Sequence, residues 1–590
     1  MMYVRGLLER EFGTEALYTQ GLRVHTTLDL DMQRAAERIV DYRLAQLADT
    51  SRTGFSHNVH NAAVVALDPH TGEVLTMVGS PNYFDPQIDG AVNAAVAPRQ
   101  PGSSIKPITY AAAFDPHRSE PLTGASVVMD VRTAFTTQEG APYVPRNYDR
   151  QWRGPVLVRQ ALASSYNVVA TKVLDMVGVD ATANLARAMG ITTFDNRERL
   201  GLALTLGGSE VRLLELTAAY GAFANGGYRV EPVVVTRVED SRGRLLKAWE
   251  ATPSVRVLDE RVAYLITDIL SDNTARTPAF GEGSALQISR PAAAKTGTST
   301  DWRDNWTIGY TPDLVVGVWA GNADNTPMVE VSGVMGAAPI WHDTMEALLK
   351  GSPVREFREP PGMVRAEVCA DSGLPPAQIA REIAHSTHRP VLTRCPHTVD
   401  EIFISGTEPT AHDNWHWLIP IDTRNGLLAG SECPEEVVTY RPYTRYPAEA
   451  QDWARSNNIP QPPDVYSPWC MAGEIASVSQ HSTDAHRAST TDASARAMVM
   501  TSPDSGSQYR LSPQIPETAQ QIFVAVRPVD GIVLQEVTLF ADGRLLATLD
   551  RPPYQVLWQM TSGAHTFTAT GIDAHGRRLT ADHIDIVVIE

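Results

Sequence analysis

A serine and a lysine three residues apart, Ser103 and Lys106, are the first pair of side chains whose spacing suggests chemistry. They follow a Pro-Gly turn signal and begin an apolar run, so we expect both on one face of the first turn of a helix. A serine hydroxyl is a weak nucleophile at neutral pH, but a lysine that is desolvated or crowded by another cation can take its proton. The pair alone predicts little, because such a tetrad also arises by chance at a helix start with an exposed lysine.

Two more polar groups follow along the chain. Ser165 and Asn167 stand two residues apart in a polar break between two helical patterns, so both can point into a cleft. Lys295, Thr296 and Gly297 follow a run of small residues in a predicted strand, where glycine lets a ligand approach the backbone. Each group is common by itself. The three together, in this order on a helix, a loop and a strand, predict a catalytic site.

The elements expected to position these groups fill roughly the first 355 residues. Residues 1–58 read as a linker segment with a charged helix, a short strand and a second helix that Asp29 or Asp31 caps. Residues 59–355 combine strand and helix patterns. We expect hairpins at 63–78 and 306–321, and helical stretches within 158–170, 180–226, 262–270 and 341–350.

The remaining residues divide into three parts. Residues 356–474 begin at a proline-rich bend and are predicted to be loop-rich. Residues 475–498 read as a polar linker. Residues 499–590 alternate strongly between apolar and polar positions, which predicts six or seven short strands in an all-β sandwich of immunoglobulin-like type.

All four cysteines, Cys369, Cys395, Cys433 and Cys470, lie in the loop-rich segment. They form no C-x-x-C pair, and the histidines show no partner at metal spacing, so we expect no metal site. Two disulfides and four buried thiols both fit the spacing. Of the three possible connectivities we favour the sequential one, Cys369 with Cys395 and Cys433 with Cys470. Disulfides would indicate an oxidising, extracytoplasmic compartment.

Composition limits the class of protein. The chain has 590 residues, 43% hydrophobic and 20% charged, which is typical of a globular protein with several domains. Its formal net charge of −18 and its lack of a Lys/Arg cluster argue against a nucleic-acid partner. No apolar run of eighteen residues and no apolar stretch near the N-terminus is present. We therefore expect neither a membrane span nor an export signal within this sequence.

The three polar groups, in this order, are similar to those of penicillin-binding proteins and class A β-lactamases. Longer stretches, namely residues 21–37, 147–149, 160–167, 206–211 with 214–217, and 295–322, resemble the transpeptidase domain of class A high-molecular-mass penicillin-binding proteins. The resemblance covers roughly residues 1–355. It implies a multidomain protein whose α/β (α+β) transpeptidase fold has a central antiparallel sheet flanked by helices.

Class A members carry a glycosyltransferase domain and a membrane anchor before the transpeptidase, and the sequence shows neither. We therefore expect a truncated gene product or an incomplete sequence. The C-terminal sandwich looks like the appended modules of some bacterial members.

The resemblance also implies roles for the site residues. Ser103 would attack the carbonyl between the two terminal D-alanines of a peptidoglycan stem peptide, and Lys106 would take its proton. Ser165 and Lys295 would pass a proton to the leaving D-alanine, and Asn167 would hold a substrate amide.

Other positions would recognise the substrate. The hydroxyls of Thr296 and Thr298 would bind its terminal carboxylate, and Gly297 would let it approach the strand. The backbone N–H groups of Ser103 and Thr298 would form the oxyanion hole.

The resemblance implies stem peptides and β-lactams as partners, a location in the bacterial cell envelope, and no cofactor. It leaves three functions open. The enzyme would be a transpeptidase if an amine resolves the acyl-enzyme, and a D,D-carboxypeptidase or β-lactamase-type hydrolase if water does. A catalytically idle relic that binds the cell wall is the third. No carboxylate motif clearly positions a deacylating water, so we favour the transpeptidase. The ligand of the sandwich, cell wall or envelope protein, cannot be read from its strands.

Overall fold

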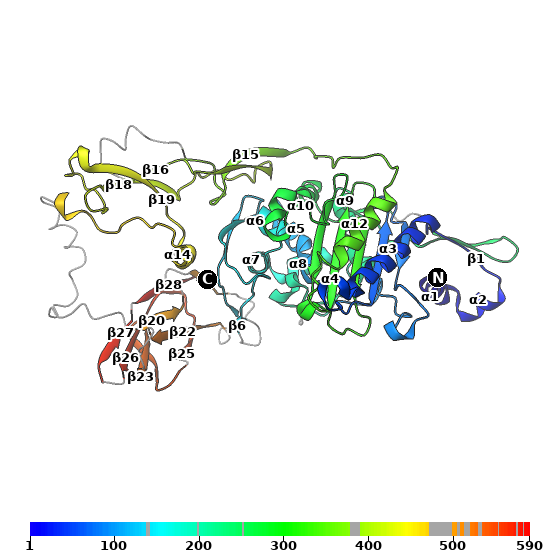
Figure 1. Ribbon diagram of the computed structural model, residues 1–590, viewed down its shortest axis with the longest axis horizontal. Coiled ribbons are helices and arrows are strands. Elements are labelled where there is room, and N and C mark those ends of the chain that lie inside the picture. Colours follow the sequence, from blue (N-terminus) through cyan, green and yellow to red (C-terminus); the bar gives the residue numbers. More distant parts are fainter. Residues whose placement is uncertain are drawn as a thin grey trace.

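The computed structural model describes residues 1–136, 142–197, 200–249, 253–377, 390–470, 498–503, 508–511, 520–528, 534–552, 554–573, 576–581 and 583–589. Figure 1 shows an α/β body in the middle of the long axis, the N-terminal helices at one end, and an elongated extension and a β-module at the other. The predicted polar linker 475–498 lies, except for Met498, outside the described residues.

A five-stranded antiparallel sheet forms the centre of the body. Its order is β12 (Ala293–Thr298), β13 (Asp304–Tyr310), β14 (Val315–Gly321), β2 (Asn61–Leu67) and β3 (Val74–Val78). The strands β2, β13 and β14 are buried along their whole length, because helices cover both faces of the sheet. The two predicted hairpins are therefore present, β2–β3 and β13–β14, and together they supply four of the five strands.

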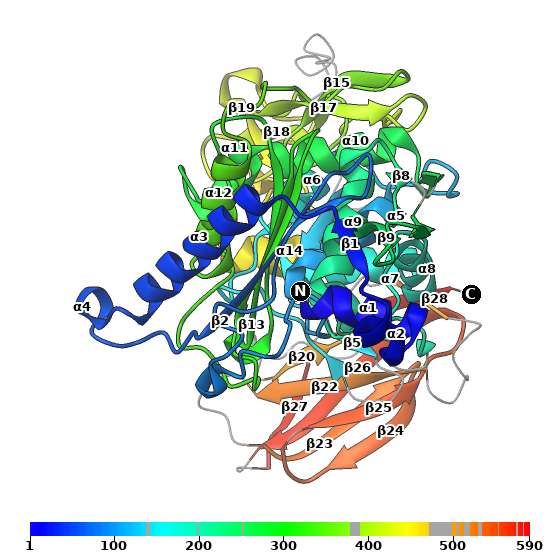
Figure 2. The same ribbon diagram turned by 90° about the vertical axis from the view of Figure 1, so that its right-hand side faces the viewer.

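Two helical layers enclose this sheet, and Figure 2 shows α3 and α12 on one side and α9 and α10 on the other. Alternate residues of β2 enter different cores: Val65 packs with the larger layer and Val64 with the smaller one. The larger layer contains α5 (Lys106–Ala113), α6 (Val158–Ala163), α7 (Asn167–Val177), α8 (Val179–Ala188), α9 (Leu213–Ala224) and α10 (Glu260–Ser271). The smaller layer contains α3 (Leu30–Ala48) and α12 (Ala337–Leu348).

The N-terminal segment is tied to the body by strand pairing. Its helices are α1 (Met2–Phe12) and α2 (Thr14–Thr19), and its strand β1 (Arg23–Thr26) pairs with β9 (Val235–Glu239), which pairs with β10 (Leu245–Ala248). Asp29 then caps α3 by accepting two backbone N–H bonds, so the expected cap is Asp29 and not Asp31. Among the described residues, no helix is both long and apolar enough to cross a membrane.

Short elements complete the body. They are the strand pairs β4 (Val127–Asp130) with β7 (Gly154–Leu157), β5 (Phe135–Thr136) with β6 (Pro142–Tyr143), and β8 (Tyr228–Arg229) with β11 (Val255–Arg256), the helices α4 (Thr50–Thr53) and α11 (Asn273–Phe280), and the 3₁₀ turns η1 (Pro86–Ile88), η2 (Gly102–Ile105), η4 (Leu202–Leu206) and η5 (Thr300–Trp302).

The extension contains more strand than its sequence predicts. Its elements are the pair β15 (Met363–Cys369) and β17 (Thr398–Ile404), the sheet β16 (Val391–Leu392), β18 (His416–Asp422) and β19 (Val438–Thr444), the helix α14 (Ala448–Ser456), and the turns η6 (Glu435–Val437) and η7 (Pro468–Cys470). One disulfide joins Cys369 to Cys395 and another joins Cys433 to Cys470, which is the sequential pairing.

The C-terminal module has two sheets around one apolar core. The smaller sheet is β20 (Met498–Ser502), β22 (Gln521–Pro528) and β25 (Gln555–Gln559). The larger is β21 (Gln508–Arg510), β28 (Ile584–Ile589), β26 (Gly563–Asp573), β23 (Leu534–Ala541) and β24 (Arg544–Leu549), with β27 (Arg578–Thr580) paired to β26. The module is thus an all-β sandwich.

Candidate active site

The serine and lysine of the first group lie where a 3₁₀ turn becomes a helix. Ser103 is in η2, and Lys106 is the first residue of α5. Within the described part of the chain, the Ser103 hydroxyl has no hydrogen-bond partner, so it is free to engage a substrate. The neighbouring hydroxyl of Ser104 points away and donates to the carbonyl of Pro101 at 2.7 Å. The sequence-predicted nucleophile is therefore the hydroxyl that remains uncommitted.

Lys106 is completely buried. Its Nζ donates to the carbonyl of Ser165 at 2.7 Å and to Oδ1 of Asn167 at 2.8 Å, and it lies 3.3 Å from Oγ of Ser165. Burial, and then the charge of Lys295, lower the pKa of Lys106 well below the usual value for a lysine. A lysine in this state gives up its proton more readily than usual, which suits a proton acceptor.

Ser165 connects the two lysines of the site. Its Oγ accepts hydrogen bonds from Nζ of Lys295 at 2.8 Å and from Nζ of Lys106 at 3.3 Å. The residue lies in the break between α6 and α7 with φ of 64°, a left-handed conformation that is unusual for a serine. Asn167 begins α7 directly after this break. The structure thus brings the first two groups together with the third.

Lys295 lies on β12 and is also buried, with 1% of its surface exposed. Its Nζ donates to Oγ of Ser165 and to the carbonyl of Thr296, both at 2.8 Å. Burial, and then the charge of Arg276, lower the pKa of Lys295 to about 7. The ammonium of Lys295 therefore gains and loses a proton near neutral pH, a property suited to proton transfer.

Two glycines allow the nucleophile turn to lie directly against β12. A Cβ at Gly297 would lie 2.1 Å from the carbonyl oxygen of Pro101, and one at Gly102 would lie 2.5 Å from that of Thr298. Gly102 also has φ of 54°, which disfavours any other residue. Any side chain at either position would push Ser103 away from the strand.

The two threonines of β12 differ in their surroundings. Thr296 is buried and Thr298 is half-buried. The hydroxyl oxygen of Thr298 accepts the backbone N–H of Gly333 at 2.9 Å, which leaves its own proton available to a ligand. Thr298 is thus the more accessible of the two predicted carboxylate ligands.

The sequence assigned no role to the residues behind Asn167. Oδ1 of Asn147 accepts the backbone N–H of Asn167 at 2.8 Å, and its Nδ2 donates to both carboxylate oxygens of Asp130, each at 2.8 Å. In the sequence, Asn147 belongs only to the stretch 147–149 that resembles the transpeptidase family. The one available signal for Asp130 is an acidic residue at the end of the apolar run Val127-Val128-Met129.

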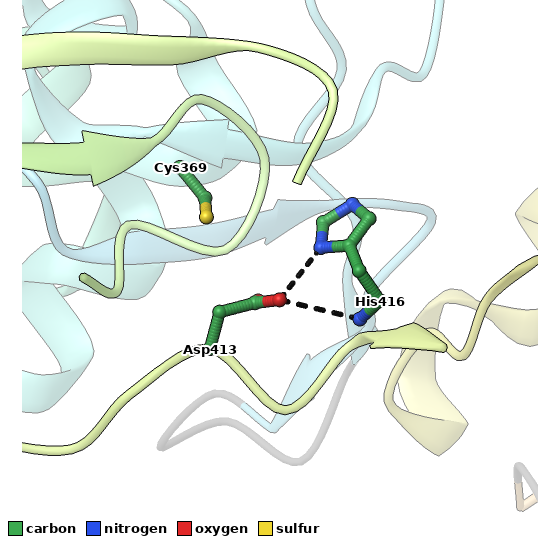
Figure 3. A group of neighbouring side chains, drawn as sticks. All are labelled: Cys369, Asp413 and His416. Atoms are coloured by element: carbon green, nitrogen blue, oxygen red, sulfur yellow. Dashed lines mark hydrogen bonds and ion pairs between the residues drawn. The ribbon is translucent and has the colours of Figure 1, made fainter. Parts of the chain in front are cut away.

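Two clusters in the extension have the side chains of metal ligands but are not assigned as metal sites. Figure 3 shows the first of them, Cys369 with Asp413 and His416; the second is Asp422 with Cys433 and Cys470. Every cysteine in these clusters is in a disulfide, so none can supply the thiolate that binds a metal.

Comparison with known proteins identifies the modules. Residues 62–346 match the penicillin binding protein transpeptidase domain, residues 359–417 the penicillin-binding protein 1A C-terminal domain, and residues 487–586 the penicillin-binding protein C-terminus family.

Individual relatives agree. The chain is 33% identical to penicillin-binding protein 2D of Bacillus subtilis over 375 residues, which is 62% of this chain and 51% of that protein. It is 31% identical to penicillin-binding protein 1A of Clostridium botulinum over 438 residues, 73% of this chain and 50% of that protein. The chain thus spans about half the length of these curated relatives.

Solved structures show the same fold. The structure of penicillin-binding protein PonA1 from Mycobacterium tuberculosis has a TM-score of 0.51 at 26% identity, and the match covers 60% of this chain and 93% of that one. Penicillin-binding protein 1A from Haemophilus influenzae has a TM-score of 0.56 at 23% identity, covering 70% of this chain and 76% of that one. With the site geometry and the family matches in agreement, the chain contains the transpeptidase region of a class A penicillin-binding protein.

Proposed function

We propose that the chain is a peptidoglycan D,D-transpeptidase that works through a serine acyl-enzyme on Ser103 and is acylated by β-lactams. The observation that carries the proposal is the hydroxyl of Ser165, which bridges two buried lysines whose pKa values are lowered. This arrangement provides a proton acceptor and a proton donor joined by one hydroxyl, next to an uncommitted serine.

In the acylation step, Oγ of Ser103 bonds to the carbonyl carbon between the two terminal D-alanines, and its proton passes to the neutral amine of Lys106. The C–N bond then breaks. The leaving amine of D-alanine takes a proton that Lys295 delivers through Ser165. A β-lactam reacts in the same way, except that its amide nitrogen stays attached to the ring-opened acyl group.

In the second step, an amine of a neighbouring stem peptide attacks the ester carbonyl and gives a proton to Lys295 through Ser165. The C–O bond to Ser103 breaks, and Ser103 recovers its proton from Lys106. Asn167 holds a substrate amide, and Thr296 and Thr298 bind the terminal carboxylate beside Lys295, with Gly297 keeping the strand edge open. The backbone N–H groups of Ser103 and Thr298 form the oxyanion hole. A donor in such a hole typically contributes about 3 kcal/mol.

We also propose where the parts act. The domain boundaries lie at about residues 58, 355, 474 and 498. The C-terminal sandwich is of the immunoglobulin-like type, and it contacts the cell wall or an envelope protein. The two disulfides support an extracytoplasmic location in the cell envelope, because disulfides persist in oxidising compartments.

Intact-mass spectrometry with and without benzylpenicillin, followed by peptide mapping, tests the function. We expect a stable adduct on the peptide that contains Ser103, none with Ser103→Ala, and a retained adduct with the control Ser104→Ala, which loses only its bond to Pro101. Consumption of the drug without an adduct would indicate a hydrolase. An intact drug and no adduct would indicate a catalytically idle relic.

A further inference from the structure

We propose that Asp130 is a positioning residue for the catalytic lysine and acts on Lys106 through Asn147 and Asn167. The inference rests on the proposed function, because it assigns Lys106 the role of proton acceptor. Asp130 lies on β4, outside the three motif groups, and its side chain hydrogen-bonds to Asn147 and Arg153 and not to Ser103, Lys106 or Lys295.

The connection is a chain of three hydrogen-bonded steps. Asp130 accepts two bonds from Nδ2 of Asn147, Asn147 accepts the backbone N–H of Asn167, and Asn167 accepts Nζ of Lys106. Each of these bonds is 2.8 Å long. The side-chain amide of Asn167 is fixed at its other end, where Nδ2 donates to the carbonyl of Arg146 at 2.9 Å.

The carboxylate fixes which way the amide of Asn147 points. An ionised carboxylate only accepts hydrogen bonds, so it selects the NH₂ end of Asn147, and the carbonyl of Gln151 accepts the same Nδ2 at 2.8 Å. The oxygen end is thereby aimed at the first turn of α7, where it accepts the N–H groups of Asn167 at 2.8 Å and Val168 at 3.4 Å. If the amide were reversed, its NH₂ group would face two N–H donors and Asn167 would lose its anchor.

Burying the carboxylate of Asp130 costs free energy that packing alone does not explain. Its side chain is completely buried, and burial raises its pKa, while hydrogen bonds from Asn147 and the charge of Arg153 act in the opposite direction. An apolar residue would fill this site without the desolvation cost of a carboxylate. Arg153 compensates part of this cost, with Nη1 3.7 Å from the carboxylate and its backbone N–H donating to Oδ2 at 3.3 Å.

Packing holds Asp130 in place. It pairs with Gly154 of β7, and the indole of Trp453 from α14 lies so close that a Cβ at Gly154 would be 2.4 Å from it. The neighbours Met129 and Val131 pack with Ala450 of the same helix. The carboxylate therefore sits on a rigid support, as a positioning group requires.

The decisive readout is the rate constant of Ser103 acylation by a fluorescent penicillin as a function of pH, measured on the full chain. With Asp130→Asn we expect acylation to fall about 10²-fold, the typical effect of displacing a catalytic group by about 1 Å. The acid limb of the profile should also move to lower pH. Asn167 then no longer holds the acceptor that favours the ammonium of Lys106, so Lys106 loses its proton more readily.

The charged and titratable groups around the chain of bonds are few. Lys295 acts on Lys106, Arg153 and Lys172 act on Asp130, and Asp130 in turn acts on Tyr110. The variant leaves all of them unchanged, so a moved acid limb reports on Lys106.

Exchanging the side chains of Asp130 and Asn147 should restore the acylation rate that the single variants lose. Asn147→Asp alone places two carboxylates together and should also slow acylation. In the double variant, Asp130→Asn with Asn147→Asp, the new amide donates to the new carboxylate, which still accepts the N–H of Asn167. We expect the double variant to recover at least tenfold of the lost rate and to restore the acid limb. Asp149→Asn is the matched control, because this exposed carboxylate binds Arg153 and the backbone N–H of Gln151 but not Asn147 or Asn167, and it should acylate as the wild type does.

The outcomes separate the two proposals. No acylation of the wild type would overturn the proposed function. A wild type that acylates, with Asp130→Asn matching it in rate and acid limb, would overturn the role of Asp130 alone. If the single variants unfold, a folded double variant with a restored rate supports the role, whereas a double variant that acylates slowly or unfolds like the singles overturns it.

Discussion

The buried basic side chains of the body and of the extension have pKa values shifted in opposite directions by their surroundings. In the body, the amines of Lys106 and Lys295 contact neutral oxygens. Burial lowers the pKa of each, and a nearby cation, Lys295 for Lys106 and Arg276 for Lys295, lowers it further. In the extension, the ring of His416, 4% exposed, lies between Asp413 at 2.8 Å and Asp371 at 2.9 Å. These contacts raise the pKa of His416 to about 9, although burial alone would lower it.

This difference separates a site built for chemistry from one built for stability. A buried amine without a carboxylate partner can exchange its proton near neutral pH, and the folded state bears the cost of holding it. An imidazolium between two carboxylates keeps its proton and joins the segments that carry them. Substitutions at the lysine site and at the histidine site test this difference separately.

The largest effect is expected from Lys106→Met, which keeps the length of the side chain and removes the amine. Acylation of Ser103 should fall by about 10²–10⁴-fold, the usual contribution of a general base. The free energy of unfolding should stay within about 1 kcal/mol of the wild type, because the lost hydrogen bonds are offset by the removal of a buried amine. Penicillin labelling and urea unfolding of the same preparation measure the two quantities. A variant that unfolds easily but acylates normally would reverse the assignment.

His416→Gln should give the opposite pattern. The variant leaves Asp413 buried without its cation, and breaking such a pair costs about 3 kcal/mol. Because the pKa of His416 is raised, its stabilisation is complete below about pH 6.5 and is lost as pH rises through about 9. The destabilisation should therefore be largest near pH 6 and shrink by pH 10, while acylation remains unchanged. His412→Gln, at an exposed histidine that lacks a carboxylate partner among the described residues, is the control.

The sequence was sufficient to find the three groups that meet in the candidate site because each is local. Ser103 with Lys106, and Ser165 with Asn167, are close in the chain, and turn signals mark the elements that carry them. The same locality explains the cap at Asp29 and the two hairpins. The immunoglobulin-like type of the sandwich and the roles of individual site residues remain predictions.

What the sequence did not reveal depends on contacts between distant segments. Asp130 reaches Asn167 only through Asn147, and His416 meets Asp371 from 45 residues away. The expectation of a loop-rich extension was wrong for β18 and β19, where Pro420 and Pro442 lie inside paired strands and weaken the strand pattern. The sequence pattern also predicts helix throughout 180–226, whereas the structure has the separate elements α8, η4 and α9 there.

Glycines divide that pattern. Gly190, with φ of 102°, follows the C-terminal end of α8. Gly207, with φ of 83°, is the residue at which η4 ends. Both conformations are left-handed and incompatible with a continuing helix. Periodicity alone does not detect such breaks, because the residues on either side still follow the apolar spacing.

The smallest effect concerns the alkaline limb of acylation. If the ammonium of Lys295 is needed, the acylation rate should decline above about pH 7 and fall about tenfold per unit well beyond it. Arg276 is buried beside this site, and its charge is one cause of the lowered pKa of Lys295. Arg276→Gln should therefore move the limb to higher pH, by about one unit or less.

The two lysine sites can be distinguished within the same pH profile. Arg276 acts on Lys295 and not on Lys106, so the acid limb should stay in place while the alkaline limb moves. Arg290→Gln, at a guanidinium near the surface that binds only backbone carbonyls, should leave both limbs unchanged. If Arg276→Gln leaves the alkaline limb in place, the titration of Lys295 does not produce that limb. The contrast with His416 would then hold for Lys106 alone.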